Sequence, residues 1–184
     1  MVESAAEKSE TKITAEKAGA SLTIWVDADS CPSLVRNHTV KMGNKLGLKI
    51  RWVANKQMPG SGAEFDGADF KMIVCGAQKD AADNYIFEHS NEGDLVITRD
   101  IVFADRLVEK GICCINDRGT EFTREMVKQR LSERDFDLQL AQIGLVKHHH
   151  EGYDKKKFAE FANSFDKVIH KLIKQMVSTI STTD

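Results

Sequence analysis

Five short apolar runs alternate with longer segments of helical pattern along most of this chain of 184 residues. The runs are rich in Val, Ile and Leu and are bounded by glycine or acidic residues, which is typical of buried strands. Strands that alternate with helices form a mostly parallel sheet with helices on both faces. The sequence therefore predicts a single three-layer α/β domain with about five strands. We expect them at residues 22–26, 48–54, 70–75, 95–98 and 112–115.

The segments between these runs have the signals of helices. Pro32 suits the first turn of a helix that Gly47 ends, and a second helix starts at Asp80 to Asp83. Residues 101–110 and about 124–134 are also predicted to be helical. A long last helix should begin near Asp154, and its apolar stripe should dock on the domain. That stripe consists of Phe158, Phe161, Phe165, Val168 or Ile169, Leu172 and Met176.

Residues 1–20 contain charged and small residues but few large apolar ones, so we expect a disordered tail before a domain at 21–184. They lack the apolar segment of a secretory signal, and no run reaches the length of a membrane span. The four cysteines form no Cys-x-x-Cys pair and are interpreted as buried thiols. A cytoplasmic protein is expected. The net charge of −2 gives no overall positive field, so any contact with nucleic acid must use a local patch.

Acidic residues follow several of the predicted strands. Asp27 and Asp29 come directly after the first strand, Asp80 and Asp83 open the helix after the third, and Asp100 follows the fourth. The carboxyl ends of parallel strands meet at one edge of the sheet, where α/β proteins bind ligands. A divalent cation relieves the repulsion between carboxylates, and Mg²⁺ or Mn²⁺ prefers such oxygen ligands. All five acids are therefore candidate metal ligands.

Helix capping is the alternative explanation for most of these acids. Asp29, Asp80 and Asp100 each stand near the start of a predicted helix, where a side-chain oxygen can accept from backbone N–H groups. Asp83 would favour the helix dipole. Capping does not explain Asp27, which ends an apolar strand before the cap position. Capping and metal binding are compatible at one edge.

Several motifs occur in the order typical of one bacterial family. They include Val26–Pro32, Val53–Asn55, Gly76–Asp83, Gly93–Ile101, Asn116–Gly119 and Arg134–Asp135. In this order the chain resembles the UPF0178 family (DUF188, YaiI/YqxD-like) over about residues 22–178. Asp117 stands where the family usually has proline, and His148–Gly152 replaces a Gly-Gly-Pro stretch. The three adjacent histidines are interpreted as a solvated loop.

The family in turn resembles the PIN-like domain superfamily of metal-dependent nucleases. Thr98-Arg99-Asp100 looks like the Thr/Ser-x-Asp signature of those nucleases, and Asp27 looks like their acid on the first strand. Asp80 or Asp83 is similar to the acid before that signature. The resemblance implies a nuclease that hydrolyses phosphodiester bonds, of RNA by our interpretation, with Mg²⁺ or Mn²⁺. Asp27, Asp83 and Asp100 would be the catalytic acids, supported by Asp29 and Asp80.

The substrate would be held by residues at the same edge. We interpret Asn55, Thr98, Arg99, Arg118 and Arg134 as substrate-binding, because arginine pairs with phosphate through two hydrogen bonds. Asn55 could orient a metal-bound water or adopt a left-handed turn. Arg134, with Arg130 four residues before it, could instead belong to a solvated helix face.

Two other functions fit the same edge. One is a protein that binds RNA or a nucleotide without turnover, and the absence of an acid from residues 33–46 favours it. The weaker one is a phosphatase, although no Asp-x-Asp-x-Thr motif supports it. Trp25 and Trp52 lie inside predicted strands, so we expect them in the core and not in base stacking.

Overall fold

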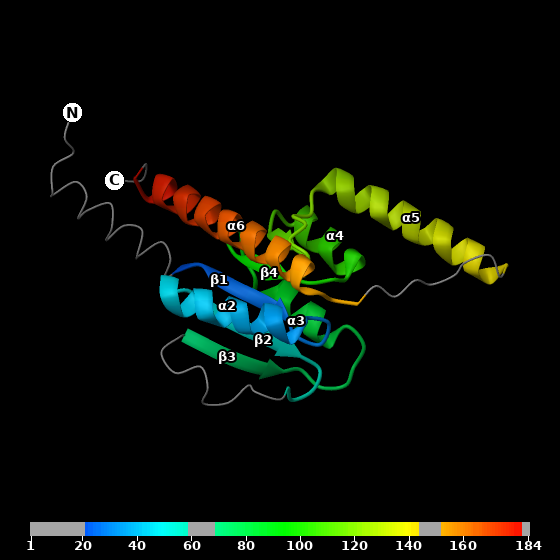
Figure 1. Ribbon diagram of the computed structural model, residues 1–184, viewed down its shortest axis with the longest axis horizontal. Helices are drawn as coiled ribbons and strands as arrows, with labels where there is room; N and C mark the ends of the chain where they lie inside the picture. The colour runs from blue at the N-terminus through cyan, green and yellow to red at the C-terminus, as the bar shows by residue number, and fades with distance from the viewer. Residues whose placement is uncertain (1–20, 59–68, 144–151, 182–184) are drawn as a thin grey trace, which may run out of the picture.

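The computed structural model describes residues 21–58, 69–143 and 152–181. Figure 1 shows its strands and helices in space. The elements are β1 (Thr23–Asp27), α2 (Ser33–Leu46), β2 (Lys49–Ala54), β3 (Asp69–Val74), α3 (Ala81–His89), β4 (Leu95–Ile97), α4 (Ile101–Glu109), β5 (Cys113–Ile115), α5 (Arg124–Gln142) and α6 (Lys155–Ser181). The predicted tail at 1–20 and the His148–His150 loop lie outside the described residues.

The sheet has five strands in the order β3-β2-β1-β4-β5, and every neighbouring pair is parallel. The α/β class and the predicted parallel sheet are thus confirmed. Strand β1 lies at the centre because the chain first builds outward through β2 and β3 and then returns through β4 and β5. The strand order reverses at β1, which is where open α/β sheets form their binding crevice. Val26 pairs with Ile97 in the register of β1 and β4.

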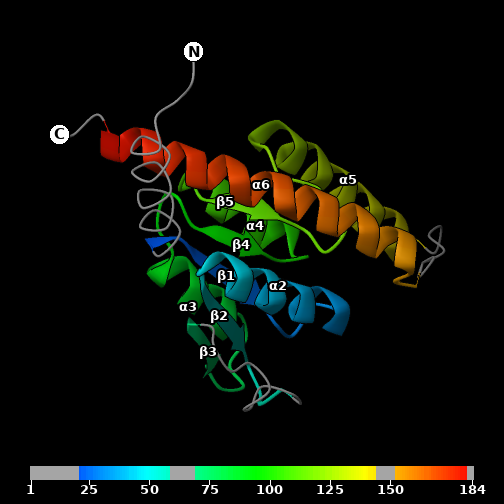
Figure 2. The same ribbon diagram turned by 60° about the vertical axis from the view of Figure 1, so that its left-hand side comes forward.

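Helices cover both faces of the sheet. Figures 1 and 2 show α2 and α6 on one face and α3 and α4 on the other. Strand β1 supplies both cores because successive side chains point to opposite faces. Ile24 and Val26 join the core beneath α2 and α6, whereas Trp25 joins the one beneath α3 and α4. Trp25 and Trp52 are both buried, so their predicted place in the core is confirmed.

The long last helix docks as its stripe predicts. Phe161, Phe165 and Ile169 are fully buried against the sheet and α2. His38 of α2 lies edge-on to the rings of Phe161 and Phe165, with ring centroids 6.1 and 5.8 Å apart. The stripe therefore serves the core, and none of the helices in the described part of the chain is long and apolar enough to cross a membrane.

Helix α5 is longer than the sequence indicated. We expected it to end near Arg134, but it continues to Gln142. No glycine or proline interrupts residues 135–142, so the sequence contains no signal that would end the helix near Arg134. Figure 1 shows its far end projecting away from the sheet, and Phe136 is 60% exposed there. Packing of α5 on α4 fixes only its first half, where Val127 is buried.

Candidate active site

Asp27 ends β1 at the centre of the carboxyl edge of the sheet, and its carboxylate is 6% exposed. The register of β1 and β4 places it beside Thr98, whose hydroxyl donates a hydrogen bond of 2.9 Å to Asp27 Oδ2. Ser30 Oγ donates to the same oxygen at 2.7 Å. Burial raises the pKa of Asp27, and these two hydrogen bonds oppose that rise. Asp27 is thus fixed in place by two hydroxyls.

Asp100 is a helix cap, as the alternative interpretation holds. Its Oδ1 accepts from the backbone N–H groups of Val102 at 2.7 Å and Phe103 at 3.2 Å. Its own N–H donates to Thr98 Oγ1 at 3.1 Å, so Thr98 links Asp100 to Asp27. Capping occupies one carboxylate oxygen. Asp100 Oδ2 makes no hydrogen bond within the part of the chain that the structure describes.

Asp83 interacts electrostatically with three other acids of this edge. Its pKa is raised to about 7, first by burial and then by the negative charges of Asp27, Asp100 and Asp80. The positive charge of Arg106 on α4 opposes the rise. The three acidic carboxylates therefore lie close enough to Asp83 to disfavour its ionisation, and they come from three separate segments of the chain. We call Asp27, Asp80, Asp83 and Asp100 the acidic cluster.

Asn55 does not hold the left-handed turn that was one of its two predicted roles. Its side-chain Oδ1 accepts from the N–H of Ala82 at 3.2 Å, in the first turn of α3. Its N–H donates to Asp29 Oδ2 at 2.6 Å. Asn55 is not in a left-handed conformation, since Asp80 is the only non-glycine residue with positive φ in the described segments. Asn55 thus joins the end of β2 to the start of α3.

One capping interpretation is wrong, and a second is correct for the position of the residue but not for its side chain. Asp29 does not cap α2, because Pro32 holds the cap position and no side chain bonds there. Its carboxylate turns instead to the N–H of Asn55. Asp80 does hold the cap position of α3, but its φ of 58° is left-handed and its side chain makes no capping bond. The Asn55 side chain caps α3 instead, because its Oδ1 accepts from the N–H of Ala82.

The predicted arginines divide between two places. Arg99 and Arg118 line one hollow beside the acidic cluster, together with Arg130. Arg134 is exposed on α5 and is not among the residues that line this hollow. Arg106, Ser30 and Asn116 also contribute to the edge, although the sequence analysis gave none of them a role in the site; Ser30 and Asn116 belong to the family motifs, and Arg106 does not. Arg106 acts on Asp83 from another helix, whereas Ser30 and Asn116 make hydrogen bonds to residues two to four positions away in the chain.

Comparison with known proteins identifies the family. A family model described as "Uncharacterized BCR, YaiI/YqxD family" matches residues 25–171. The chain belongs to the UPF0178 family. A UPF0178 protein of Treponema denticola is 44% identical over 154 residues, which cover 84% of this chain and 96% of the relative. Those of Treponema pallidum and Ectopseudomonas mendocina are 37% and 35% identical, over 83% and 82% of this chain and 84% and 99% of theirs. No solved structure matches the chain significantly.

The acids of this UPF0178 protein suit a hard divalent cation by their chemistry. Within the described residues, however, no group of three or more His, Cys, Asp or Glu side chains is arranged so that it could hold a metal ion. Mg²⁺ usually keeps several waters and takes only one or two protein carboxylates, with substrate phosphates completing the shell. The acidic cluster fits this open type of site and not a closed cage. Asp80, Asp83 and the uncapped oxygen of Asp100 are the ligands that the hydrogen bonds leave available.

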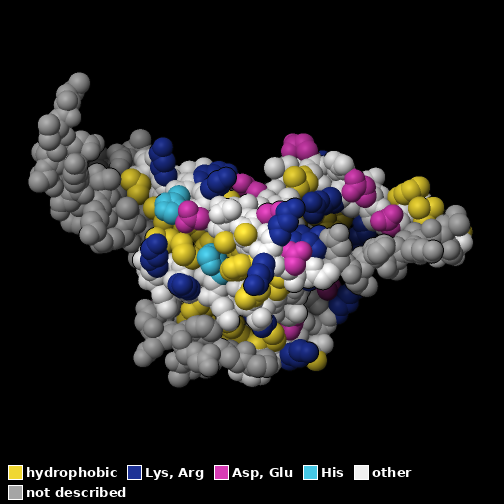
Figure 3. All heavy atoms as spheres, viewed as in Figure 1, with side chains coloured by type: hydrophobic (Ala, Val, Ile, Leu, Met, Phe, Trp, Pro, Cys, Tyr) yellow, Lys and Arg dark blue, Asp and Glu magenta, His cyan; other side chains and the backbone are white. Residues whose placement is uncertain are grey.

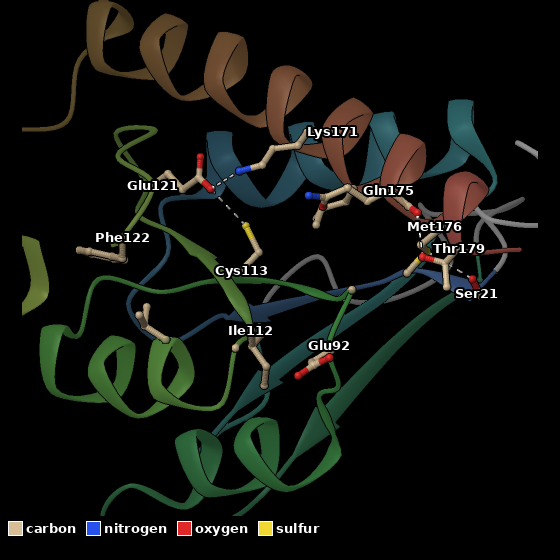
Figure 4. A pocket seen from close by; sticks show the side chains of 14 residues that line it. Ser21, Glu92, Ile112, Cys113, Glu121, Phe122, Lys171, Gln175, Met176 and Thr179 are labelled. Carbon is tan, nitrogen blue, oxygen red and sulfur yellow. Dashed lines mark hydrogen bonds and ion pairs between the residues drawn. The ribbon is translucent and has the colours of Figure 1, made fainter. Parts of the chain in front are cut away.

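A second, more apolar hollow lies elsewhere on the protein. It measures about 690 Å³ beside β5 and α6, and Ser21 and Gly93 at the start of β1 and β4 border it. Figure 4 shows Lys171 and Glu121 facing each other there, with Nζ 2.8 Å from Oε1, and the Cys113 thiol turned towards Glu121. Burial raises the pKa of Cys113 to about 12, so its thiol is not a ready nucleophile. The acidic cluster therefore remains the candidate active site.

Proposed function

We propose that this protein hydrolyses phosphodiester bonds of RNA with Mg²⁺ or Mn²⁺ held by the acidic cluster. The observation that carries the proposal is the grouping of Asp27, Asp80, Asp83 and Asp100 at the reversal point of a parallel sheet, where Thr98 links Asp27 to Asp100 and the charges of Asp27, Asp80 and Asp100 act on Asp83. Uncompensated carboxylates in a half-buried site cost stability, and a cation removes that cost. The same arrangement supports the nuclease function that the family resemblance implies.

Each residue has a distinct part in the proposed reaction. Asp83 and Asp100 would bind the cation directly, while Asp27 and Asp29 hold the surrounding loops through Thr98 and Asn55. The cation supplies Lewis-acid polarisation of a phosphoryl oxygen and a more acidic bound water. The linked hydrogen bonds from Asp27 through Thr98 to Asp100 keep the ends of β1 and β4 in register.

Binding of RNA or a nucleotide without turnover is the second candidate. It is favoured by the hydrogen bonds that already occupy Asp27 Oδ2, Asp29 Oδ2 and Asp100 Oδ1. If those oxygens stay committed to protein donors, the edge holds too few free ligands for catalysis. The two functions differ in their need for a cation.

The test uses Asp100→Asn, because asparagine caps a helix almost as well as aspartate and the fold should be retained. We expect Mn²⁺ affinity, measured by titration calorimetry, to fall at least about tenfold and RNA cleavage to be lost. Asp137→Asn on the exposed part of α5 removes an equal charge away from the cluster and should change neither. Wild-type protein that binds no Mn²⁺ and cleaves no RNA while folded would leave only the binding function.

A further inference from the structure

A tight turn follows β5 and carries Arg118. The side-chain oxygen of Asn116 accepts from the N–H groups of Arg118 and Thr120, each at 2.9 Å. The backbone of Asn116 adds a bond to Thr120 and another to Gly119, each 3.0 Å long. Four hydrogen bonds within five residues fix the backbone of this turn. The position from which the Arg118 side chain extends is therefore set before any ligand binds.

The turn is also held against α6. A Cβ at Gly119, whose φ is +81°, would lie 2.7 Å from the backbone oxygen of Glu160, so only glycine allows this approach. The hydroxyl of Tyr153 donates to the backbone oxygen of Asp117 at 2.7 Å. These contacts come from the chain just before α6 and from its first turns. They add to the rigidity of the turn.

Asp117 forms an ion pair with Arg99 but no hydrogen bond. Its carboxylate is buried, and Oδ2 lies 3.5 Å from Nε of Arg99. That distance is an ion pair but not a hydrogen bond, and Oδ2 has no hydrogen-bond partner within the described residues. The Arg99 side chain is 49% exposed. Asp117 thus positions the guanidinium by charge and leaves its terminal N–H groups available to a ligand.

These residues line a hollow of about 390 Å³. Arg99, Arg118 and Arg130 contribute three positive charges, against the negative charges of the buried Asp117 and of Glu160. Arg130 extends from α5 over the ring of Phe122, 5.8 Å from its centroid. Figure 3 shows Lys and Arg side chains gathered between α5 and α6 on this face of the molecule. The hollow is a basic site with arginines on three sides, from the segments after β4, after β5 and in α5.

The hollow adjoins the acidic cluster. Arg99 and Ile101 line it, and Asp100 of the cluster stands between them in the chain. The carboxyl edge of the sheet is therefore negative over β1 and positive past β4 and β5. A single phosphate over the cation needs only the negative part. The adjacent arginines fit a second phosphate on the same ligand, because guanidinium groups bind phosphate oxygens in pairs.

We propose that this hollow binds the phosphate next to the scissile one, so that the substrate is an RNA strand and not a phosphomonoester. The inference rests on the proposed function for the place of the scissile phosphate. Phe122, the aromatic side chain that lines the hollow, is buried, so it offers no exposed ring for a base to stack on. The site therefore contacts the phosphates of the RNA and not its bases, so binding is independent of base sequence.

The experiment measures binding of a fluorescein-labelled single-stranded RNA of 12 uridines by anisotropy, in EDTA and over a range of salt concentrations. Arg118→Ala and Arg130→Ala each remove one arginine from the hollow. Lys45→Ala is the matched control, since Lys45 lies in the last turn of α2 at the opposite edge of the sheet. We expect each arginine variant to bind about fivefold or more weakly and the slope of log K against log salt to fall by about 1. The control should stay within about twofold of wild type.

Mn²⁺ titration of the same proteins separates the two proposals. Arginine variants that lose RNA binding and keep Mn²⁺ affinity support the hollow as a distinct subsite. If the arginine variants bind RNA as tightly as Lys45→Ala does, the hollow is not a phosphate site, even if the wild type binds Mn²⁺ and cleaves RNA. The wild type could also neither bind Mn²⁺ nor cleave RNA, while the arginine variants lose RNA binding. This result would support RNA binding by the hollow and refute the proposed hydrolysis. A 12-adenosine RNA that binds more than about tenfold differently would overturn the claim of backbone recognition.

Discussion

Replacing Asp83 by asparagine should stabilise the metal-free protein at pH 8. Burial and three neighbouring carboxylates raise the pKa of Asp83 from 3.8 to about 7. The folded state therefore binds this proton more tightly than the unfolded state does, and stability falls as the pH rises from about 4 to about 7. Above about pH 7 the Asp83 carboxyl is ionised in both the folded and the unfolded state, and the full loss of stability is present. Asparagine has the same size and no charge.

The magnitude follows from the size of the pKa change. One pKa unit corresponds to about 1.36 kcal/mol, so the full change is equivalent to about 4 kcal/mol. Asp83 is only half-buried, and solvent screens part of this repulsion. Asparagine also loses the attraction of a negative charge to the first turn of α3, worth about 0.3–1 kcal/mol. We therefore expect a net gain of about 1–2 kcal/mol, which is a rise in Tm of about 3–6 °C.

The assay is thermal unfolding of wild type and Asp83→Asn in EDTA at pH 8 and pH 4.5. The variant should have a higher Tm than the wild type at pH 8. Most of this difference should disappear at pH 4.5, where the Asp83 carboxyl of the folded wild type is already protonated. Added Mn²⁺ should stabilise the wild type more than the variant, because binding to the folded state alone raises stability. Asp137→Asn is the control for general charge effects. A variant that is less stable than wild type at pH 8 would refute the repulsion between these acids.

Three further changes test the packing of the fold. Gly119→Ala should destabilise by about 2 kcal/mol or more, because its φ is +81° and the new Cβ would meet the backbone of Glu160; an unchanged urea midpoint would contradict this. Phe165→Ala should cost about 3–5 kcal/mol and Phe136→Ala almost nothing, since the first ring is fully buried and the second is 60% exposed; equal urea midpoints would rule out the docking of α6. His38 has its pKa lowered, first by burial, so stability should fall as the pH drops below about 6.5, and His38→Gln should flatten that part of a urea-unfolding profile between pH 7.5 and 5.5.

The sheet could be predicted from the sequence because the signals for its strands are local. Each strand is an apolar run between clear breakers, and parallel pairing follows from the helices between strands. Acids at one edge could be expected for the same reason, because Asp27 ends β1 and Asp100 lies shortly after β4, and these two strands pair in the sheet. The end of α5 was predicted too early, because no glycine or proline marks a stop near Arg134 and the helix continues to Gln142.

The roles of single side chains at the edge were not predictable in the same way. Asn55 caps a helix that begins 26 residues later in the chain, and that partner becomes visible only when β2 and α3 meet. Arg106 opposes the acids from one turn further along α4 than any motif reaches. Asp117 interacts with Arg99 across neighbouring strand ends. Such contacts join segments that are distant in sequence, so spacing along the chain carries no signal for them.

The two charges of the carboxyl edge follow from the topology. Since β1 is central, the segments after β1, β3 and β4 bring their acids to the middle of the edge, while β5 places its Arg118 turn at one side. Arg99 and Asp100 are consecutive after β4, so the boundary between the two charges falls between neighbouring residues of one loop. Thr98 ties that loop to Asp27 through its hydroxyl, and Asp117 ties Arg99 to the turn after β5. If the acidic cluster holds a cation as proposed, a ligand that spans the boundary would present an anion to each part, one bridged by the cation and one held directly. A chain of phosphates has this property and an isolated phosphate does not.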